Sequence, residues 1–295
     1  MDKSVKTILI TGGTGFLGSH LADVLVSNGY SVVILKRSSS DLWRIDHFMS
    51  SLKSYDIDLV PIESAFIENK IDCVIHTACH YGRNNDPIEE IINTNLVFGL
   101  QILDLALKNK VQIFMNSDTL LPKNLNSYAL SKNQFVDWLE HFSKNIKVIN
   151  LKIEHMFGPK DDPKKLVPWI ISEFEAQVST IALTAGQQKR DFIYIDDVVS
   201  AFVLLLEKVS ILSGFSQYEV GTGMSVTVKI FLSTLKEVYE ENKKEVATQL
   251  EFGAVPHREG EIMNVQVDNS DLVNLGCKPC VTLEQGLNNL MREYL

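Results

Sequence analysis

Residues 11–20 constrain the fold of this chain more than any other stretch. They read TGGTGFLGSH and place Gly12, Gly15 and Gly18 three residues apart, after an apolar run at 5–10 and before apolar residues at helical spacing. In such a loop the first glycine permits a tight turn, the second lets the backbone approach a pyrophosphate, and the third lets the helix pack closely on the strand. The amino terminus of the helix offers free N–H groups to the phosphates. The stretch therefore predicts a dinucleotide-binding loop between a strand and a helix.

The rest of the amino-terminal half alternates between apolar strands and amphipathic helices. A strand, a helix and a second strand are expected within residues 5–35. Further strands are expected at 73–77, 111–115 and 148–153, separated by helices at 88–108 and 128–142. Alternation of this kind is typical of a parallel sheet with helices on both faces. We therefore expect an α/β fold with a doubly wound parallel sheet.

The alternation becomes irregular from about residue 156, where Gly158-Pro159 and Pro163 interrupt it. Later helices are expected at 166–175, 197–207 and 228–241. We expect residues 1–155 to form the dinucleotide-binding domain, with part of the later chain returning to it. Residues 156–295 are expected to form mainly a smaller α/β lobe. A chain of 295 residues is long enough to bury a core in both parts.

Charge and composition exclude several classes of protein. Lys and Arg number 28 against 37 Asp and Glu, giving a net charge of −9 that repels nucleic-acid backbones and anionic membrane surfaces. No stretch approaches the roughly 20 apolar residues of a membrane span, and the amino terminus lacks the shape of a signal peptide. We therefore expect a cytoplasmic protein that binds neither nucleic acid nor membrane.

The cysteines do not indicate a metal site. The four are Cys73, Cys79, Cys277 and Cys280, and only the last two form a C-x-x-C pair. This pair lacks a second pair and a nearby histidine, which a zinc site would require. We expect these two thiols to pack in a turn, with a metal or redox role as the alternative.

The strand end at 32–40 indicates which dinucleotide is bound. An acidic residue about 20 residues past a glycine loop would accept the ribose 2′-hydroxyl of NAD. The sequence instead reads VVILKRSSS, with Lys36 and Arg37 before three serines. Cations and hydroxyl donors suit a 2′-phosphate, and Arg37 can also lie flat against adenine. We therefore expect NADP(H) to be preferred over NAD(H); the alternative is a solvated strand end whose charges contact nothing.

A tyrosine and a lysine stand four residues apart at the start of the helix expected at 128–142. Residues at this spacing share one face of a helix, so the Tyr128 phenol and the Lys132 ammonium can face one cofactor. Eleven residues before Tyr128, Ser117 is expected just past the carboxyl end of a strand, where open α/β sheets bind ligands. Together, these three side chains predict a catalytic site.

These motifs, in this order, resemble the extended short-chain dehydrogenase/reductase family of the NAD-dependent epimerase/dehydratase type. The resemblance covers essentially the whole chain and includes IDCVIHTAC at 71–79, Asn95 within INTNLVFG, HMFGP at 155–159 and KRDFIYIDDVVSAF at 189–202. The segments at 113–121, 151–159, 187–199 and 251–263 are most similar to nucleotide-sugar 4-ketoreductases of the CDP-abequose synthase type, which serve bacterial surface polysaccharides such as the lipopolysaccharide O-antigen. The resemblance implies a Rossmann doubly wound sheet with a smaller C-terminal α/β substrate-binding lobe.

The resemblance also implies roles for individual residues. Tyr128 would be the general acid/base, Lys132 would hold the nicotinamide ribose and lower the tyrosine pKa, and Ser117 would hydrogen-bond the reacting oxygen. A free phenol has a pKa near 10, and an adjacent ammonium favours its ionised form. The full set of expected cofactor contacts is Gly12, Thr14, Gly15, Phe16, Leu17, Gly18, Lys36, Arg37, Asp56, Ile57, Thr77, Ala78, Cys79, Asn95, Tyr128, Lys132 and Ile153.

Arg190 and Arg258 match the family positions that hold the diphosphate of a nucleotide sugar. Guanidinium groups bind phosphates through paired charged hydrogen bonds, although both arginines could instead sit in ion pairs with Asp191, Glu259 or Glu261. His155 is a further candidate for a phosphate contact. Leu166, Val167, Ile181 and Leu183 would line the base pocket or belong to the core, and His80, Tyr81 and Asn126 would contact the sugar or be ordinary loop residues.

One departure from the family pattern, together with the expected cofactor, narrows the possible reaction types. Dehydratases of this family carry Asp-Glu after the catalytic hydroxyl, whereas here Asp118 and Thr119 follow Ser117, so the second base is lacking. A 2′-phosphate pocket indicates NADPH consumed in each cycle, which favours reduction of a C4 ketone on a nucleotide-linked deoxyhexose of the CDP-4-keto-3,6-dideoxyhexose type. The alternatives are an NAD-dependent nucleotide-sugar 4-epimerase and, more distantly, a non-catalytic NADP-binding sensor.

The helix that begins near Tyr128 carries an apolar stripe of Leu130, Phe135, Trp138 and Phe142. Related proteins pair such helices in a homodimer, and the same stripe would alternatively cover the sheet. We expect a homodimer.

Overall fold

The computed structural model describes residues 5–83, 86–212, 214–243, 246–258 and 260–294. The chain divides into two compact units, which are described separately. The first comprises Met1–Ile153 and Val199–Tyr218, and the second comprises Glu154–Val198 and Glu219–Leu295. The chain therefore leaves the first unit after its sixth strand and returns to it for about twenty residues.

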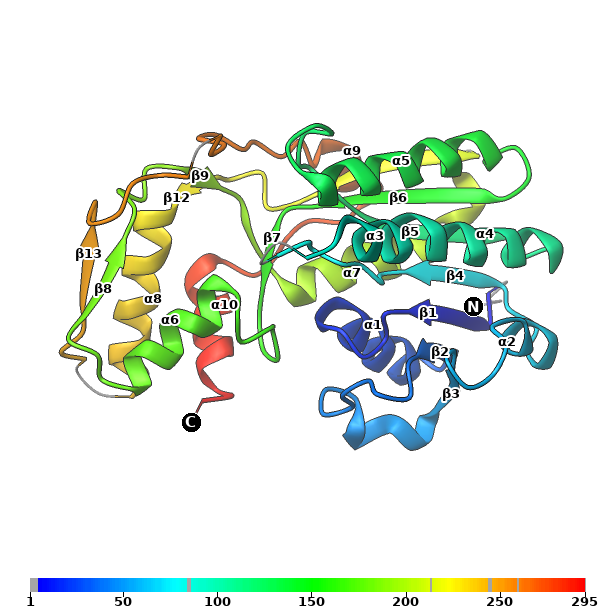
Figure 1. Ribbon diagram of the computed structural model, residues 1–295, viewed down its shortest axis with the longest axis horizontal. Coiled ribbons are helices and arrows are strands. Elements are labelled where there is room, and N and C mark those ends of the chain that lie inside the picture. Colours follow the sequence, from blue (N-terminus) through cyan, green and yellow to red (C-terminus); the bar gives the residue numbers. More distant parts are fainter. Residues whose placement is uncertain (1–4, 84–85, 213, 244–245, 259, 295) are drawn as a thin grey trace. The chain divides into compact units, whose positions relative to one another are not determined.

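A seven-stranded sheet forms the centre of the first unit, in the order β11-β6-β5-β4-β1-β2-β3 (Figure 1). Every neighbouring pair from β6 across to β3 is parallel. The strands are β1 (Thr7–Thr11), β2 (Ser31–Lys36), β3 (Leu52–Asp56), β4 (Cys73–His76), β5 (Ile113–Thr119), β6 (Lys147–Ile153) and β11 (Phe215–Val220). The predicted doubly wound parallel sheet is confirmed. The strands β3 and β11, at its two edges, were not predicted.

Helices cover both faces of this sheet because crossovers of one hand place their helices on opposite faces when the strand order runs in opposite directions from β1. On one face α2 (Glu63–Glu68), α4 (Phe98–Lys108) and α5 (Ser127–Phe142) bury a continuous apolar cluster against the sheet. Phe114 of β5 and Phe135 of α5 are its largest side chains that are completely inaccessible to solvent. Helix α1 (Phe16–Ser27) packs on β1 and β2, where Ile8 and Ile10 project to the opposite face. The unit also contains the short helices η1 (Asp46–Ser51) and η3 (Val209–Ile211) and most of α7 (Ile195–Glu207).

The strand order reverses between β1 and β4. The chain builds β1, β2 and β3 toward one edge, then crosses back to place β4, β5 and β6 on the other side of β1. Ligands of open α/β sheets bind at the carboxyl ends of the strands beside such a reversal. The glycine loop follows β1 and the Thr77–Cys79 segment follows β4, so both lie at this point.

One helical stretch corrects the expectation about membrane spans. Helices α3 (Ile88–Ile92), η2 (Asn93–Val97) and α4 are continuous, and these 21 residues are long and apolar enough by composition to cross a membrane. Ile102, Leu103 and Ala106 of this stretch are buried in the apolar cluster against the sheet. Packing on the sheet therefore accounts for much of its apolar character.

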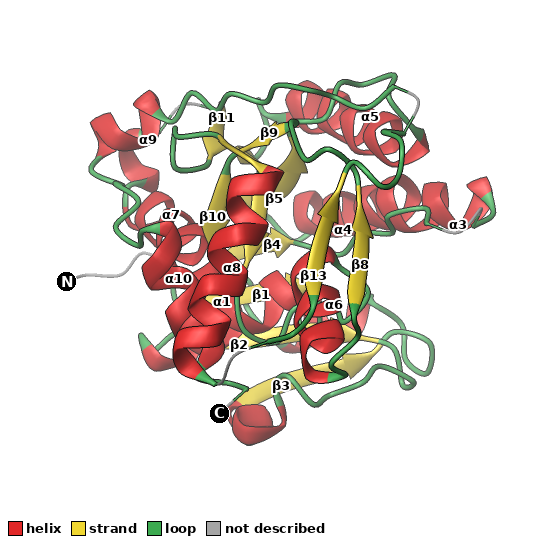
Figure 2. Ribbon diagram, turned by 90° about the vertical axis from the view of Figure 1, so that its left-hand side faces the viewer, coloured by secondary structure: helices red, strands yellow, loops and turns green. Residues whose placement is uncertain are grey.

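The second unit is built from short strand pairs and helices around an aromatic core. β7 (His155–Phe157) pairs with β10 (Phe192–Tyr194), β9 (Lys189–Arg190) with β12 (Val226–Thr227), and β8 (Thr180–Leu183) with β13 (Gln249–Phe252), the last pair side by side in Figure 2. Phe231 stacks on Phe192, with ring centroids 3.7 Å apart, and meets Phe157 edge-on. The helices are α6 (Leu166–Glu175), α8 (Val228–Asn242), α9 (Ser270–Leu275), α10 (Leu283–Met291) and the first turn of α7.

Candidate active site

The glycine loop has the close geometry that the sequence predicts. Gly12 has a φ of +69°, and a Cβ added there would lie 2.7 Å from the Ala78 nitrogen. A Cβ at Gly18 would lie 2.2 Å from the Gly12 carbonyl oxygen, so the third glycine lets α1 begin directly against the turn. The corresponding position at Gly15 is more open, with the same oxygen 3.2 Å away. A side chain is therefore excluded on steric grounds at the first and third glycines.

The first turn of α1 can accept an anion. Its N-cap is Gly15, no side chain caps its backbone N–H groups, and its first turn holds no acidic residue. Uncapped N–H groups and the positive end of the helix dipole attract phosphate. Arg44, which the sequence analysis did not single out, reaches this loop, and its Nη1 lies 3.5 Å from the Thr14 carbonyl oxygen. These residues fit a dinucleotide pyrophosphate.

Hydrogen bonds connect the glycine loop to the segment after β4. The Thr77 hydroxyl donates to the Thr11 carbonyl at 2.7 Å, and the Ala78 N–H donates to the Thr11 hydroxyl at 3.3 Å. The same hydroxyl is 2.8 Å from Nδ1 of His76, whose ring is completely buried. These hydrogen bonds therefore fix the glycine loop and the segment after β4 to each other at the strand reversal.

We expected two available cations at the end of β2, but one of them is already paired. The Lys36 ammonium forms an ion pair with the Asp56 carboxylate at the end of β3, so two predicted cofactor contacts are bound to each other. Asp58 accepts hydrogen bonds from the Ser38 N–H at 2.7 Å and from its hydroxyl at 2.5 Å, which lower the pKa of that carboxyl. The Arg37 side chain is exposed. Ile57, half-buried, packs against the apolar cluster, and its N–H donates to the Lys36 carbonyl.

The predicted catalytic residues lie together at the carboxyl end of β5. Ser117 is the fifth residue of that strand, rather than just past its end as predicted, because β5 continues to Thr119. The Lys132 ammonium, from the second turn of α5, donates to the Ser117 carbonyl at 2.6 Å and is almost completely buried. The Ser117 hydroxyl donates to the His76 carbonyl at 3.1 Å. Lysine and serine are therefore fixed by backbone carbonyls of neighbouring strands.

Tyr128 stands one turn before Lys132, with its ring against that of Tyr81 at a centroid distance of 5.2 Å. Burial, together with the nearby Cys79 and Asp118, raises the pKa of its phenol well above the ordinary value, while a hydrogen bond with Thr119 acts in the opposite direction. This is the reverse of the lowering expected from Lys132, because burial dominates and the ammonium is directed to the Ser117 carbonyl. The surroundings of the phenol therefore disfavour its ionised form.

Asn95 and Asn126 position other residues of this region. The buried Asn95 amide donates to the His80 carbonyl and the Ser131 hydroxyl, and its oxygen accepts the His80 N–H at 2.7 Å. It lies in a π-helical turn, a distortion often found at functional sites. Asn126 is the N-cap of α5, and its side chain accepts the Ala129 N–H at 2.8 Å. These amides order the loop and the helix that carry the candidate catalytic residues.

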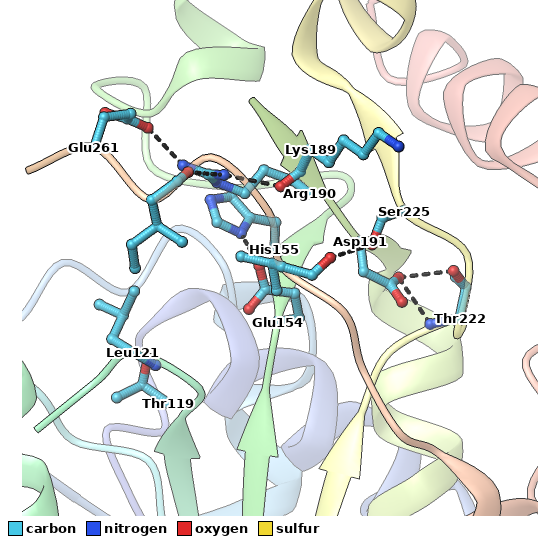
Figure 3. Close-up of polar contacts among 12 residues, drawn as sticks. Thr119, Leu121, Glu154, His155, Lys189, Arg190, Asp191, Thr222, Ser225 and Glu261 are labelled. Atoms are coloured by element: carbon cyan, nitrogen blue, oxygen red, sulfur yellow. Dashed lines mark hydrogen bonds and ion pairs between the residues drawn. The ribbon is translucent and has the colours of Figure 1, made fainter. Parts of the chain in front are cut away.

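In the second unit Arg190 is already paired. Its guanidinium donates to Glu261 at 2.5 Å, to the Ile262 carbonyl at 2.6 Å and to the Lys189 carbonyl at 2.8 Å (Figure 3). Asp191, which is completely buried, accepts from Thr222 and Gly223, and burial raises the pKa of its carboxyl. The ion-pair alternative for Arg190 is therefore realised with Glu261. The Arg258 side chain is exposed.

His155 is oriented by its neighbour. Its Nδ1 lies 2.6 Å from a carboxylate oxygen of the buried Glu154 (Figure 3). Its ring meets Phe192 edge-on. Of the residues expected at the base pocket, Val167, Ile181 and Leu183 are buried, and Leu166 is 37% exposed. Leu166 therefore remains the base-pocket candidate, whereas the other three belong to the core.

Among the described residues there is no cluster of His, Cys, Asp and Glu that could hold a metal ion. Cys277 and Cys280 lie beside α10, and the Cys280 N–H and thiol both donate to the Asp197 carboxylate. This carboxylate raises the pKa of both thiols, together with burial in the case of Cys277. The pair lies in the irregular segment between α9 and α10, and its thiols are held in the less reactive protonated form.

A family model, curated proteins and solved structures all show similarity to enzymes that act on nucleotide sugars. The model of the NAD dependent epimerase/dehydratase family matches residues 8–221. The chain is 34% identical to a CDP-abequose synthase of Salmonella muenchen and 31% identical to one of Salmonella typhimurium, with 97% of each chain covered. Among solved structures, UDP-glucose 4-epimerase of Thermotoga maritima with UDP-glucose is 25% identical, with a TM-score of 0.82 and 98% of each chain covered.

Proposed function

The chain belongs to the NAD dependent epimerase/dehydratase family, and we propose that it uses NADPH to reduce the C4 ketone of a nucleotide-linked deoxyhexose. It is an NAD(P)-dependent enzyme of the extended short-chain dehydrogenase/reductase type that acts on nucleotide sugars. The observation that carries the proposal is the similarity over 97% of the chain to two proteins named CDP-abequose synthase. The proposed substrate is accordingly a CDP-4-keto-3,6-dideoxyhexose, and the proposed location is the cytoplasm.

The geometry of the first unit supports a reduction. When bound, the nicotinamide cofactor supplies a hydride. Tyr128, at the start of α5, would then give its proton to the oxygen that gains negative charge, as the general acid of the reduction. The Ser117 hydroxyl turns from the His76 carbonyl to donate to the same oxygen. Lys132, anchored on the Ser117 carbonyl, would hold the nicotinamide ribose of the cofactor from α5.

Dehydration is disfavoured by the residues at the end of β5. Thr119 hydrogen-bonds Tyr128 and occupies the place where dehydratases of this family carry a glutamate. A hydroxyl is too weak a base to remove the proton that elimination of water requires. The chain is therefore proposed to receive a keto sugar rather than to make one by dehydration.

An NAD-dependent 4-epimerase is the second candidate, favoured by the likeness to UDP-glucose 4-epimerase. The proposed use of NADPH requires a binding site for its 2′-phosphate. Because Lys36 is paired with Asp56, other groups would have to bind this phosphate. We assign the 2′-phosphate to the exposed Arg37 and to the serines at 38–40, where Ser38 would exchange its hydrogen bonds with Asp58 for bonds to the phosphate. An epimerase returns the hydride to its substrate and needs no added NADPH.

The diphosphate of the substrate is assigned to Arg190, Arg258 and His155 of the second unit. Binding at Arg190 requires the diphosphate to replace Glu261, which now takes one end of the guanidinium. One anion then substitutes for another, so the buried guanidinium keeps a charged partner. His155, oriented by Glu154, presents its second nitrogen for a phosphate contact.

A homodimer is proposed through α5 and its neighbours. Helix α5 packs beside α3, η2 and α4. Phe135 is buried against the sheet, whereas several large apolar side chains of these helices are exposed, namely Ile88, Ile92, Val97, Leu130 and Trp138. Exposed apolar patches of this kind favour association.

The direct test is oxidation of NADPH or NADH with a panel of nucleotide sugars that differ in base and in the presence of a C4 ketone. The proposal predicts turnover with NADPH and a CDP-linked 4-keto sugar. Turnover of a C4-hydroxyl sugar without any added dinucleotide would instead establish the epimerase.

A further inference from the structure

The ring of Tyr81 lies against the ring of Tyr128, and the mechanism above does not use it. The two ring centroids are 5.2 Å apart, and the ring planes are inclined by 35°. Aromatic rings at this separation attract each other beyond what the burial of their area supplies. Because Tyr81 is 39% exposed, it adds little to the apolar core of the first unit. Its contact with Tyr128 therefore calls for a role at the site.

The segment that carries Tyr81 is fixed on both sides of that residue. Before it, the buried Asn95 side chain accepts the His80 N–H at 2.7 Å and donates to the His80 carbonyl at 2.9 Å. After it, the Gly82 N–H donates to Nδ1 of His80 at 3.1 Å. Gly82 has a φ of +65°, and a Cβ there would lie 2.6 Å from the Ile91 side chain. The backbone of Tyr81 therefore has a defined place.

Arg83 holds the Tyr81 ring from the same loop. The Cζ atom of Arg83 lies 4.9 Å from the centroid of that ring. A guanidinium over an aromatic face is attracted by the negative charge of the π electrons. The Tyr81 ring thus has contacts with both Arg83 and Tyr128, and a change of its rotamer would break both.

Tyr128 depends on contacts from outside its own helix. It is the second residue of α5, and its side chain is half-buried. Side chains of a helix lean toward its amino terminus, so a side chain in the first turn has no preceding turn to pack on. Tyr81, from the loop after β4, supplies a ring at that place. Because a displacement of about 1 Å at a reacting group can lower the rate by about 10²-fold, this contact is placed to affect catalysis.

We propose that Tyr81 is a positioning residue that holds the Tyr128 ring in the orientation from which its phenol donates the proton. This inference rests on the proposed function, in which Tyr128 is the general acid. Because the contact joins two rings, the role requires the aromatic ring of Tyr81 rather than its hydroxyl. Loss of that ring should slow the chemical step and leave the binding of sugar and dinucleotide unchanged.

The test compares Tyr81→Leu, which removes the ring, with Tyr81→Phe, which keeps it. For reduction of the CDP-linked 4-keto sugar by NADPH, we expect kcat to be about ten- to a hundredfold lower in Tyr81→Leu, at unchanged KM. Tyr81→Phe should retain the wild-type kcat. The matched control is Tyr294→Leu, the same exchange at a half-buried tyrosine that also has a cation, Lys243, over its ring, and it should retain kcat.

Three results would each overturn the proposal. The first is an unchanged kcat in Tyr81→Leu. The second is a higher KM at unchanged kcat in that variant, which would make Tyr81 a wall of the sugar site. The third is an equal loss of kcat in Tyr81→Phe, which would assign the effect to the hydroxyl.

The surroundings of Tyr128 are also measured without substrate, by fluorine NMR of the full-length chain labelled with 3-fluorotyrosine. The Tyr128 resonance is the one that is lost in Tyr128→Phe. We expect it to move in Tyr81→Leu, because the ring current of Tyr81 is removed, and to stay close to its wild-type position in Tyr81→Phe. A resonance that stays in place in Tyr81→Leu would overturn the positioning role. A wild type that shows this shift but reduces no keto sugar would contradict the proposed function and leave the ring contact standing.

Discussion

In the cofactor site, the availability of a cation for the ligand depends on its pairing as well as on the type of residue. Lys36 and Arg37 are adjacent in the sequence, yet Lys36 pairs with Asp56 and Arg37 is exposed. We predict that Arg37→Ala weakens NADPH binding about ten- to a hundredfold, the value of one or two charged hydrogen bonds, and leaves NADH binding nearly unchanged. Isothermal titration with both dinucleotides measures this. Equal losses for NADPH and NADH would show that Arg37 does not contact the 2′-phosphate.

His76 ties protein stability to pH. Burial, with Lys132 nearby, lowers the pKa of its imidazole to about 3 in the folded chain, against about 6.5 when unfolded. The neutral ring therefore contributes stability that is complete above pH 6.5 and is lost as the pH falls from 6.5 toward 3, by about 1.4 kcal/mol per pH unit.

The measurement is the free energy of unfolding in denaturant at pH 7 and one pH unit below the unfolded pKa of histidine. We predict that the wild type loses about 1.4 kcal/mol more between these conditions than His76→Asn does. His141→Asn, at an exposed position of α5, should lose as much as the wild type. Equal losses for the wild type and His76→Asn would contradict the assignment.

Helices and strands with a local apolar pattern were predicted correctly. Strands that form only by pairing with a neighbouring strand were missed. The strand-loop-helix unit at the glycine loop and the helices that carry Lys132 and Phe98 follow from apolar spacing alone. Strand β3 reads LKSYD and is half-exposed, so it has no apolar run to find; it forms because it adds to β2 in register. Strand β11 likewise depends on β6, at the other edge of the sheet.

Close contact of α4 and α5 rests on one glycine. A Cβ at Gly99 would lie 2.8 Å from the ring of Phe135, which is completely buried. We predict that Gly99→Ala destabilises the fold by about 1–3 kcal/mol, since the ring has no room to move. In Gly99→Ala combined with Phe135→Leu the smaller side chain should accommodate the methyl group. Thermal unfolding of both single variants and the double variant measures the coupling, and strictly additive effects would show that the contact is not limiting.

For the whole molecule, the sequence was sufficient for the fold class and the family, because several motifs had to occur in one order. It was not sufficient for the pairings that join distant segments. Lys36 with Asp56, Arg190 with Glu261 and Asp118 with Asn150 are 20, 71 and 32 residues apart. No local pattern reports which polar side chains the fold will bring together, and the first two of these pairs determine which cations remain for ligands.

Assembly is a further property of the whole molecule. We predict a dimer by sedimentation at micromolar concentration, since the exposed side chains on α3, η2 and α5 form an apolar surface. Trp138→Lys should shift the equilibrium to monomer without unfolding the chain, because Trp138 is 46% exposed. A wild type that sediments as a monomer would refute the dimer.

The central claim is that the chain delivers a hydride from NADPH to a C4 ketone while Tyr128 supplies the proton. The most direct measurement is the mass of the sugar formed from CDP-4-keto-3,6-dideoxyhexose and NADPH deuterated on the transferable position of the nicotinamide. The account predicts one deuterium at C4 for each NADPH oxidised, and a rate about 10²- to 10⁴-fold lower in Tyr128→Phe. A product that forms without deuterium and without NADPH consumption would contradict it.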